Sequence, residues 1–116
     1  GPYSHIAKAG PFITIGGTAG VDPATGELAG PDVTSQTRQI LDAFAVMLAS
    51  VGAGLSDIMH INIFLTDIAD FAEMNAAYAE KMGDLRPART AIGVTGLPKP
   101  GVLLTMNLTA VAGDAG

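Results

Sequence analysis

The stretch Ile58-Met59-His60-Ile61-Asn62-Ile63-Phe64-Leu65-Thr66 sets the architecture that we expect for this 116-residue chain. Every second residue from Met59 to Leu65 is apolar, whereas His60 and Asn62 fall on the alternate positions. Because side chains of a β-strand point alternately to opposite faces, the pattern predicts a strand with one fully apolar face. We expect that face to pack on helices and the partly polar face to lie against something only half-buried.

Two segments, one before and one after this strand, show the spacing of amphipathic helices. The first runs from Thr34 and is expected to stop at Gly52. The second follows Asp70, which should cap it in a capping-box-like pair with Glu73, and stops at Gly83. The apolar positions are Ile40, Leu41, Phe44, Met47, Leu48 and Val51 in the first helix, and Phe71, Met74, Tyr78 and Met82 in the second.

Two short strands, 3–9 and 12–18, are predicted at the start of the chain, joined as a hairpin by the turn dipeptide Gly10-Pro11. The glycine-rich stretch 16–31 should be an exposed loop. Within it, Asp22-Pro23-Ala24-Thr25-Gly26 fits a type I turn.

Two further strands, 90–97 and 102–111, flank Pro98-Lys99-Pro100-Gly101. The predicted order is therefore β-β-α-β-α-β-β. Such an order indicates an α+β fold, with a mixed sheet and both helices on one of its faces. A length of 116 residues is close to the commonest domain size, so we expect a single domain spanning 1–116.

Composition limits the classes of function. The formal net charge is −5, which opposes binding to nucleic acid, and 48% of the residues are apolar, which predicts contact with another subunit. The chain has no cysteine, so disulfides, thiolate metal sites and a cysteine nucleophile are excluded. No signal-peptide pattern or long apolar run is present, and we therefore expect a cytoplasmic protein that does not insert into membranes.

Metal, phosphate and acid–base sites have little support in the sequence. The two histidines, His5 and His60, lie far apart without accompanying ligand spacing, so no metal site is predicted. The run Gly16-Gly17-Thr18-Ala19-Gly20 lacks the Lys-Ser/Thr of a phosphate-binding loop. Its glycines either let a ligand approach the backbone closely or simply form a turn. No carboxylate stands out as a general base.

The stretch Arg86-Pro87-Ala88-Arg89-Thr90 is the strongest candidate for binding an acidic substrate. Pro87 restricts the backbone, so that Arg89 should project from the entrance of a strand. A guanidinium in that position can hold a carboxylate through two parallel hydrogen bonds, although a plain surface arginine is the alternative. On the last strand, Thr105, Asn107 and Thr109 share one face and are predicted to orient water at a subunit junction.

Taken together, these motifs resemble the RidA/YjgF family, and the resemblance covers almost the whole chain in order. The stretches that carry it are Gly1-Pro2-Tyr3-Ser4, the strand ending in Gly16-Gly17, Asp22-Pro23-Ala24-Thr25-Gly26-Glu27-Leu28, Thr37-Arg38-Gln39-Ile40-Leu41, Phe64-Leu65-Thr66-Asp67, Asp70-Phe71-Ala72-Glu73-Met74-Asn75, Arg86-Pro87-Ala88-Arg89-Thr90 and Leu97-Pro98-Lys99.

The resemblance implies a chorismate-mutase-like fold and a homotrimer with clefts shared between subunits. It implies a hydrolase acting on C–N bonds, which converts enamines and imines such as 2-aminoacrylate and 2-iminopropanoate to a keto acid and ammonia without a cofactor. By position it makes Arg89 the carboxylate-binding arginine, Tyr3 the cleft tyrosine, Gly17 a backbone contact and Asn75 a residue near the cleft.

Departures from the family pattern also fall in this predicted site. Gly16 stands where a serine is frequent and Ala91 where a cysteine is common, and an insertion near Pro100 shifts the hairpin of the last two strands. Thr105 then occupies the place of a water-positioning glutamate, and Asn107 that of a second acid. Threonine is no carboxylate base but can hold water.

The departures leave two interpretations open. One is a deaminase that is slower or acts on a different substrate, with Arg89 and Thr105 as its catalytic residues. The other is a non-catalytic trimeric protein that binds small carboxylates or keto acids in the same cleft.

Overall fold

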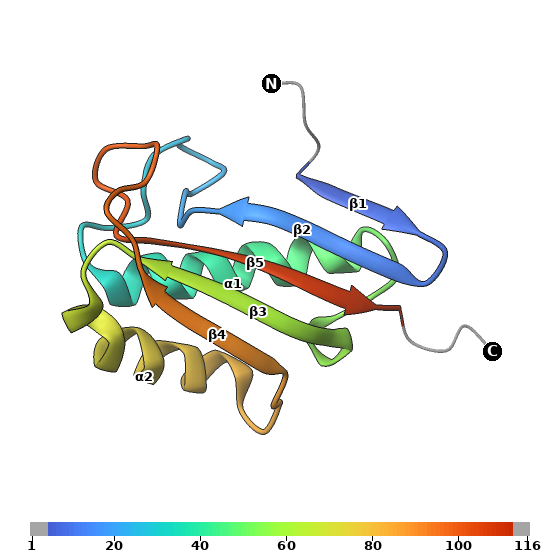
Figure 1. Ribbon diagram of the computed structural model, residues 1–116. Coiled ribbons are helices and arrows are strands. Elements are labelled where there is room, and N and C mark those ends of the chain that lie inside the picture. The colour runs from blue at the N-terminus through green and yellow to red at the C-terminus, as the bar shows by residue number, and fades with distance from the viewer. Residues whose placement is uncertain (1–4, 113–116) are drawn as a thin grey trace.

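A five-stranded sheet with two helices forms the body of the computed structural model, which describes residues 5–112 (Figure 1). The strands lie in the order β1-β2-β5-β3-β4, and the helices are α1 and α2. The bounds are β1 Ile6–Ala9, β2 Phe12–Thr18, α1 Val33–Ala49, β3 Ile58–Leu65, α2 Phe71–Met82, β4 Ala88–Gly93 and β5 Leu104–Val111. The predicted α+β order and the mixed sheet are confirmed.

Strand β5 is the centre of the sheet, because it pairs antiparallel with both β2 and β3. Strand β3 also pairs parallel with β4. The expected hairpin between the last two strands is wrong, since β3 lies between β4 and β5. A parallel pair needs a crossover connection, and α2 provides it between β3 and β4.

The strand bounds differ from the predicted ones where the chain leaves the sheet. Strand β4 runs from Ala88 to Gly93 and not over the predicted 90–97, and Arg89, its second residue, lies at the strand entrance as predicted. Strand β1 begins at Ile6, and the predicted Tyr3 lies outside the described residues. The turn at Asp22 is confirmed, because the Asp22 carbonyl accepts hydrogen bonds from the amides of Thr25 and Gly26.

The two helices begin with different capping arrangements. Asp32 caps α1 and accepts a hydrogen bond from the Ser35 amide at 3.0 Å. The predicted capping box at Asp70 is wrong, because the Asp70 side chain makes no capping bond to α2. A 3-10 turn precedes α2, and Asp67 caps that turn by accepting from the Ala69 amide.

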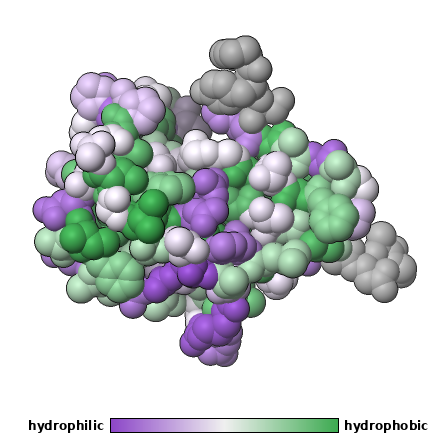
Figure 2. Space-filling model, viewed as in Figure 1, coloured by the Kyte–Doolittle hydropathy of each residue, from purple (hydrophilic) through white to green (hydrophobic). Residues whose placement is uncertain are grey.

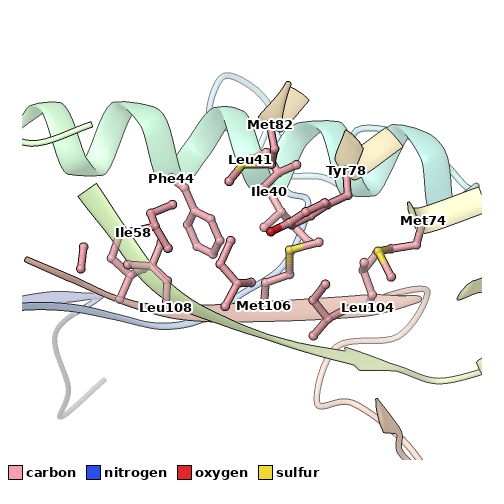
Figure 3. Close-up of a cluster of buried hydrophobic side chains, with 14 of the residues drawn as sticks. Ile40, Leu41, Phe44, Ile58, Met74, Tyr78, Met82, Leu104, Met106 and Leu108 are labelled. Carbon is pink, nitrogen blue, oxygen red and sulfur yellow. The ribbon is translucent and has the colours of Figure 1, made fainter. Parts of the chain in front are cut away.

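The core lies between the helices and one face of the sheet, where Figure 3 shows side chains from both layers interlocking. Ile61, Ile63 and Leu65 of β3 are fully buried there, as their alternation predicted. Met59 is the exception and is 55% exposed. A register shift between Ile58 and His60 turns Ile58 into the core in its place.

No helix among residues 5–112 has both the length and the apolar character required to cross a bilayer.

The side chain of Gln36 in α1 is polar but fully buried, and it forms hydrogen bonds with two loops. Its Nε2 donates to the carbonyls of Gly30 at 3.0 Å and Gly101 at 3.1 Å. Its Oε1 accepts from the Leu103 amide at 2.9 Å. This single amide therefore satisfies backbone groups of both the loop before α1 and the loop before β5.

We expect Gln36→Ala to lower the free energy of unfolding by about 3 kcal/mol, because three backbone groups lose their partner inside the protein. Urea denaturation followed by circular dichroism measures the change. Gln39→Ala is the matched control, since the side chain of this half-buried neighbour on α1 makes no hydrogen bond to any residue within 5–112. Equal losses for the two variants would contradict the role given to Gln36.

Candidate functional site

The Arg89 side chain lies on the helix-covered side of β4, where it contacts side chains of α2. Arg89 pairs with the buried Ile61 of β3 and so points the same way as the core residues. Its Nη1 donates to Asn75 Oδ1 at 2.7 Å. Its Cζ lies 4.7 Å from the ring centre of Tyr78 and 5.7 Å from that of Phe71. One hydrogen bond and two aromatic faces therefore fix the guanidinium.

A pocket of about 320 Å³ opens beside Arg89, between the second half of α2 and the start of β4. Its size suits a small ligand. Arg89 is half-buried and forms no ion pair within the described part of the chain, so its charge is available to an anion. The lining residues are Asn75, Tyr78, Ala79, Met82, Leu85, Arg86, Pro87 and Arg89.

Tyr78 lines the pocket with its ring while its hydroxyl lies in the core. The residue is 8% exposed, and its hydroxyl makes no hydrogen bond with any described residue. Figure 3 shows the oxygen directed into the apolar cluster. Burial raises the pKa of the phenol, and the charges of Arg89 and Arg86 oppose this by a smaller amount. The phenol is therefore kept neutral.

The other face of the sheet is not covered by helices and carries a polar centre. Asn62 Nδ2 donates to Asn107 Oδ1 at 2.8 Å, between neighbouring strands β3 and β5. Thr105 lies on the same face, opposite Phe64. Figure 2 looks onto this side and shows hydrophilic groups near the middle with hydrophobic groups to the left and right. We call this the open face.

Gly16 and Gly17 form a bulge in β2 directly beside Asn107. The register moves from Ile15 opposite Leu108 to Thr18 opposite Met106, so the two glycines share one partner position. Neither has a positive φ, and no described atom lies within 4 Å of a Cβ built at Gly17. The described chain thus leaves space at Gly17 for an outside group, whereas the Gly16 amide donates to the His5 carbonyl at 3.0 Å.

The structure separates the predicted site residues into two groups. Arg89 and Asn75 meet on the helix-covered side, whereas Gly16, Gly17, Thr105 and Asn107 gather on the open face. Because the sheet lies between the groups, one chain does not bring Arg89 and Thr105 together. Ala91 packs its methyl against the core and does not line the pocket.

The sequence analysis did not identify the aromatic residues that contact Arg89 or the second arginine that lines the pocket. Phe71 and Tyr78 were interpreted as an apolar core stripe, and Arg86 only as the residue before a proline. Helical spacing carried a signal, because Phe71, Asn75 and Tyr78 lie four and three residues apart and therefore share one face of α2. That face is the one against Arg89.

Comparison with known proteins identifies the family. The family model described as Endoribonuclease L-PSP matches residues 1–112. A RutC family protein of Pyrococcus horikoshii is 44% identical over 99 residues, covering 85% of this chain and 79% of the relative. The chain therefore belongs to the YjgF/RidA family.

Two other relatives carry more specific descriptions. Reactive Intermediate Deaminase A, chloroplastic, of Arabidopsis thaliana is 36% identical, over 84% of this chain and 52% of the relative. The crystal structure of E. coli TdcF with bound serine aligns with a TM-score of 0.89 and 32% identity, covering 96% of this chain and 88% of that one. The close structural match agrees with a chorismate-mutase-like α+β fold.

We expect Tyr78→Phe to raise the free energy of unfolding by about 1 kcal/mol at neutral pH, because it removes a buried hydroxyl without a partner. The raised phenol pKa means that the unfolded chain loses this proton first. Stability of the wild type should therefore fall as the pH rises above about 10, and the advantage of the variant should grow there.

Urea denaturation of both proteins in the same buffers at pH 7 and above pH 10 measures this difference, since lysine titration is common to the two. A variant that is less stable than the wild type, or an advantage that shrinks at high pH, would show that the Tyr78 hydroxyl is satisfied in solution.

Proposed function

We propose that the protein hydrolyses small enamine and imine carboxylates, of the 2-aminoacrylate and 2-iminopropanoate class, to a keto acid and ammonia. The observation that carries the proposal is Arg89, a half-buried guanidinium that Asn75 orients at a small pocket and that no described acid neutralises. Such a group suits the carboxylate that all of these substrates carry.

The relatives support the same class of ligand. One is named a reactive intermediate deaminase, and another was solved with serine, a small molecule with a carboxylate. The name endoribonuclease attached to the family model fits this chain less well, because a net charge of −5 disfavours the phosphate backbone of RNA.

The chemistry makes modest demands on the protein. Water adds to the electrophilic carbon of the C=N bond, and the resulting carbinolamine expels ammonia to leave the keto acid. A pocket that holds the carboxylate and places water beside that carbon supplies much of the rate enhancement through orientation. Metal and cofactor are not needed for these steps.

We further propose that a second copy of the chain completes the site. Arg89 lies on one side of the sheet, whereas Thr105, Asn107 and the Gly16–Gly17 bulge lie on the other. In a ring of three subunits, the open face of one chain could meet the Arg89 pocket of its neighbour. Thr105 would then hold the water, and the glycine backbone would contact the substrate.

A non-catalytic binding protein is the second candidate, and one observation favours it. Among the residues that the structure describes, no aspartate, glutamate or histidine lines the Arg89 pocket, and Tyr78 buries its hydroxyl away from it. A protein with this lining holds a small carboxylate or keto acid without a general base beside it.

We expect Arg89→Ala to lower the acceleration of 2-aminoacrylate hydrolysis about 100-fold, because the carboxylate loses its clamp. The imine is generated enzymatically, and pyruvate release is followed. Arg38→Ala is the control, since Arg38 pairs with Glu80 away from the pocket. No acceleration by the wild type would contradict the deaminase, and pyruvate binding that still depends on Arg89 would then select the binding protein.

Mixing two impaired variants tests the shared cleft. Arg89→Ala should be about 100-fold slower than the wild type, and Thr105→Val about tenfold slower. After unfolding and refolding together in equal amounts, about a quarter of the clefts should combine an intact Arg89 with an intact Thr105 from its neighbour. Recovery of activity in the mixture is expected, whereas the average of the two separate rates would contradict a site made by two chains.

A further inference from the structure

A second arginine lines the Arg89 pocket. Arg86 lies in the connection between α2 and β4, where its Nη1 donates to the carbonyls of Gly83 at 2.6 Å and Leu85 at 2.9 Å. Within residues 5–112, no recorded hydrogen bond uses its Nε or Nη2. The two carbonyls therefore anchor one edge of the guanidinium and leave the other edge for a ligand.

The two positive charges at this pocket are not balanced by acids of the described chain. Its ion pairs are Arg38 with Glu80 and Lys81 with Asp42, and neither arginine of the pocket takes part in one. The part of the chain that the structure describes contributes no carboxylate to the pocket lining. Two like charges at one small pocket repel each other, so an anion that carries two charges relieves more of this repulsion than a single carboxylate does.

We propose that the preferred ligand is a dicarboxylate of four or five carbons, in which Arg89 binds the carboxylate beside the reacting carbon and Arg86 binds the distal one. The inference deepens the proposed function, on which its catalytic part rests. A pocket of about 320 Å³ suits a molecule of that size. The substrate is then a 2-imino dicarboxylate or its enamine.

The reaction balances as for the smaller substrates. Water adds to the imine carbon and ammonia leaves, giving a 2-oxo dicarboxylate with no change in oxidation state. The reaction that supplies the substrate is the oxidation of an acidic amino acid at its α-carbon, which yields the imine before water reaches it.

Binding of two keto acids of equal length separates the contribution of the second charge. 2-Oxoglutarate and 2-oxopentanoate each have five carbons but differ in the distal carboxylate. By calorimetry, the wild type should bind 2-oxoglutarate about tenfold more tightly, as expected for one added charge-assisted hydrogen-bonded contact. In Arg86→Gln the ratio of the two affinities should fall to about one, whereas Arg86→Lys should keep part of it.

Arg38→Gln makes the same substitution at an arginine outside the pocket and should keep the wild-type ratio. Circular dichroism of each variant checks the fold. A ratio near one in the wild type, or an unchanged ratio in Arg86→Gln, would overturn the proposal. Tighter binding of 3-phosphoglycerate than of 2-oxoglutarate would assign the second charge to a phosphate and overturn the dicarboxylate.

Turnover distinguishes this inference from the function on which it rests. 2-Iminoglutarate and 2-iminopentanoate are generated in place by amino-acid oxidases, and the imine that escapes is trapped with semicarbazide. Faster removal of 2-iminoglutarate that depends on Arg86 is the expected result. Equal removal of both imines would leave the deaminase intact and overturn the dicarboxylate preference. Removal of neither imine, with Arg86-dependent binding of 2-oxoglutarate, would overturn the deaminase and keep the ligand.

Discussion

The packing of alternate side chains of β5 and β3 against the helices fixes which residues lie on each face of the sheet. Leu104, Met106 and Leu108 of β5 face the helices and are buried in the core beside Ile61 and Ile63 of β3. Their neighbours Thr105 and Asn107 are thereby fixed on the open face. Register with β3 then assigns Arg89 of β4 to the opposite, helix-covered side. The division of the predicted site follows from the same periodicity that stabilises the fold.

Much of the fold could be predicted, because the spacing of apolar residues within a short segment distinguishes a helix from a strand. The wrong predictions concern positions where the structure depends on local irregularities or on contacts between distant parts of the chain. Met59 is exposed because of a bulge, which simple alternation does not contain. The capping box at Asp70 gave way to a 3-10 turn capped by Asp67. The order of strands in the sheet is set by contacts across the whole chain, so a hairpin of the last two strands was a natural but wrong expectation.

Some residues of the candidate site could be predicted from the sequence, but their arrangement in space could not. Arg89 was predicted from the stretch 86–90 and from the family resemblance, Asn75 from the resemblance alone, and a hydrogen bond joins the two side chains. Tyr78 was interpreted as a core residue because of its helical spacing, and its hydroxyl is indeed buried. The spacing does not reveal that the face of its ring contacts the Arg89 guanidinium. The separation of Arg89 from Thr105 needs the strand register, and no pattern within a single strand contains it.

The side chains around the arginine pocket all come from one short, continuous piece of chain, residues 75–89, whereas the polar centre of the open face is assembled from β2, β3 and β5. The arginine pocket therefore depends on one local segment, whereas the polar centre depends on strands that are distant in the sequence. Substitutions within the α2–β4 connection can alter which anion is accepted while the sheet remains as it is. The open face has no such freedom, since each of its strands also supplies the core. If Arg89 and Arg86 bind the ligand as proposed, its selection depends on a short local segment, whereas the opposite half of the cleft depends on residues from three strands.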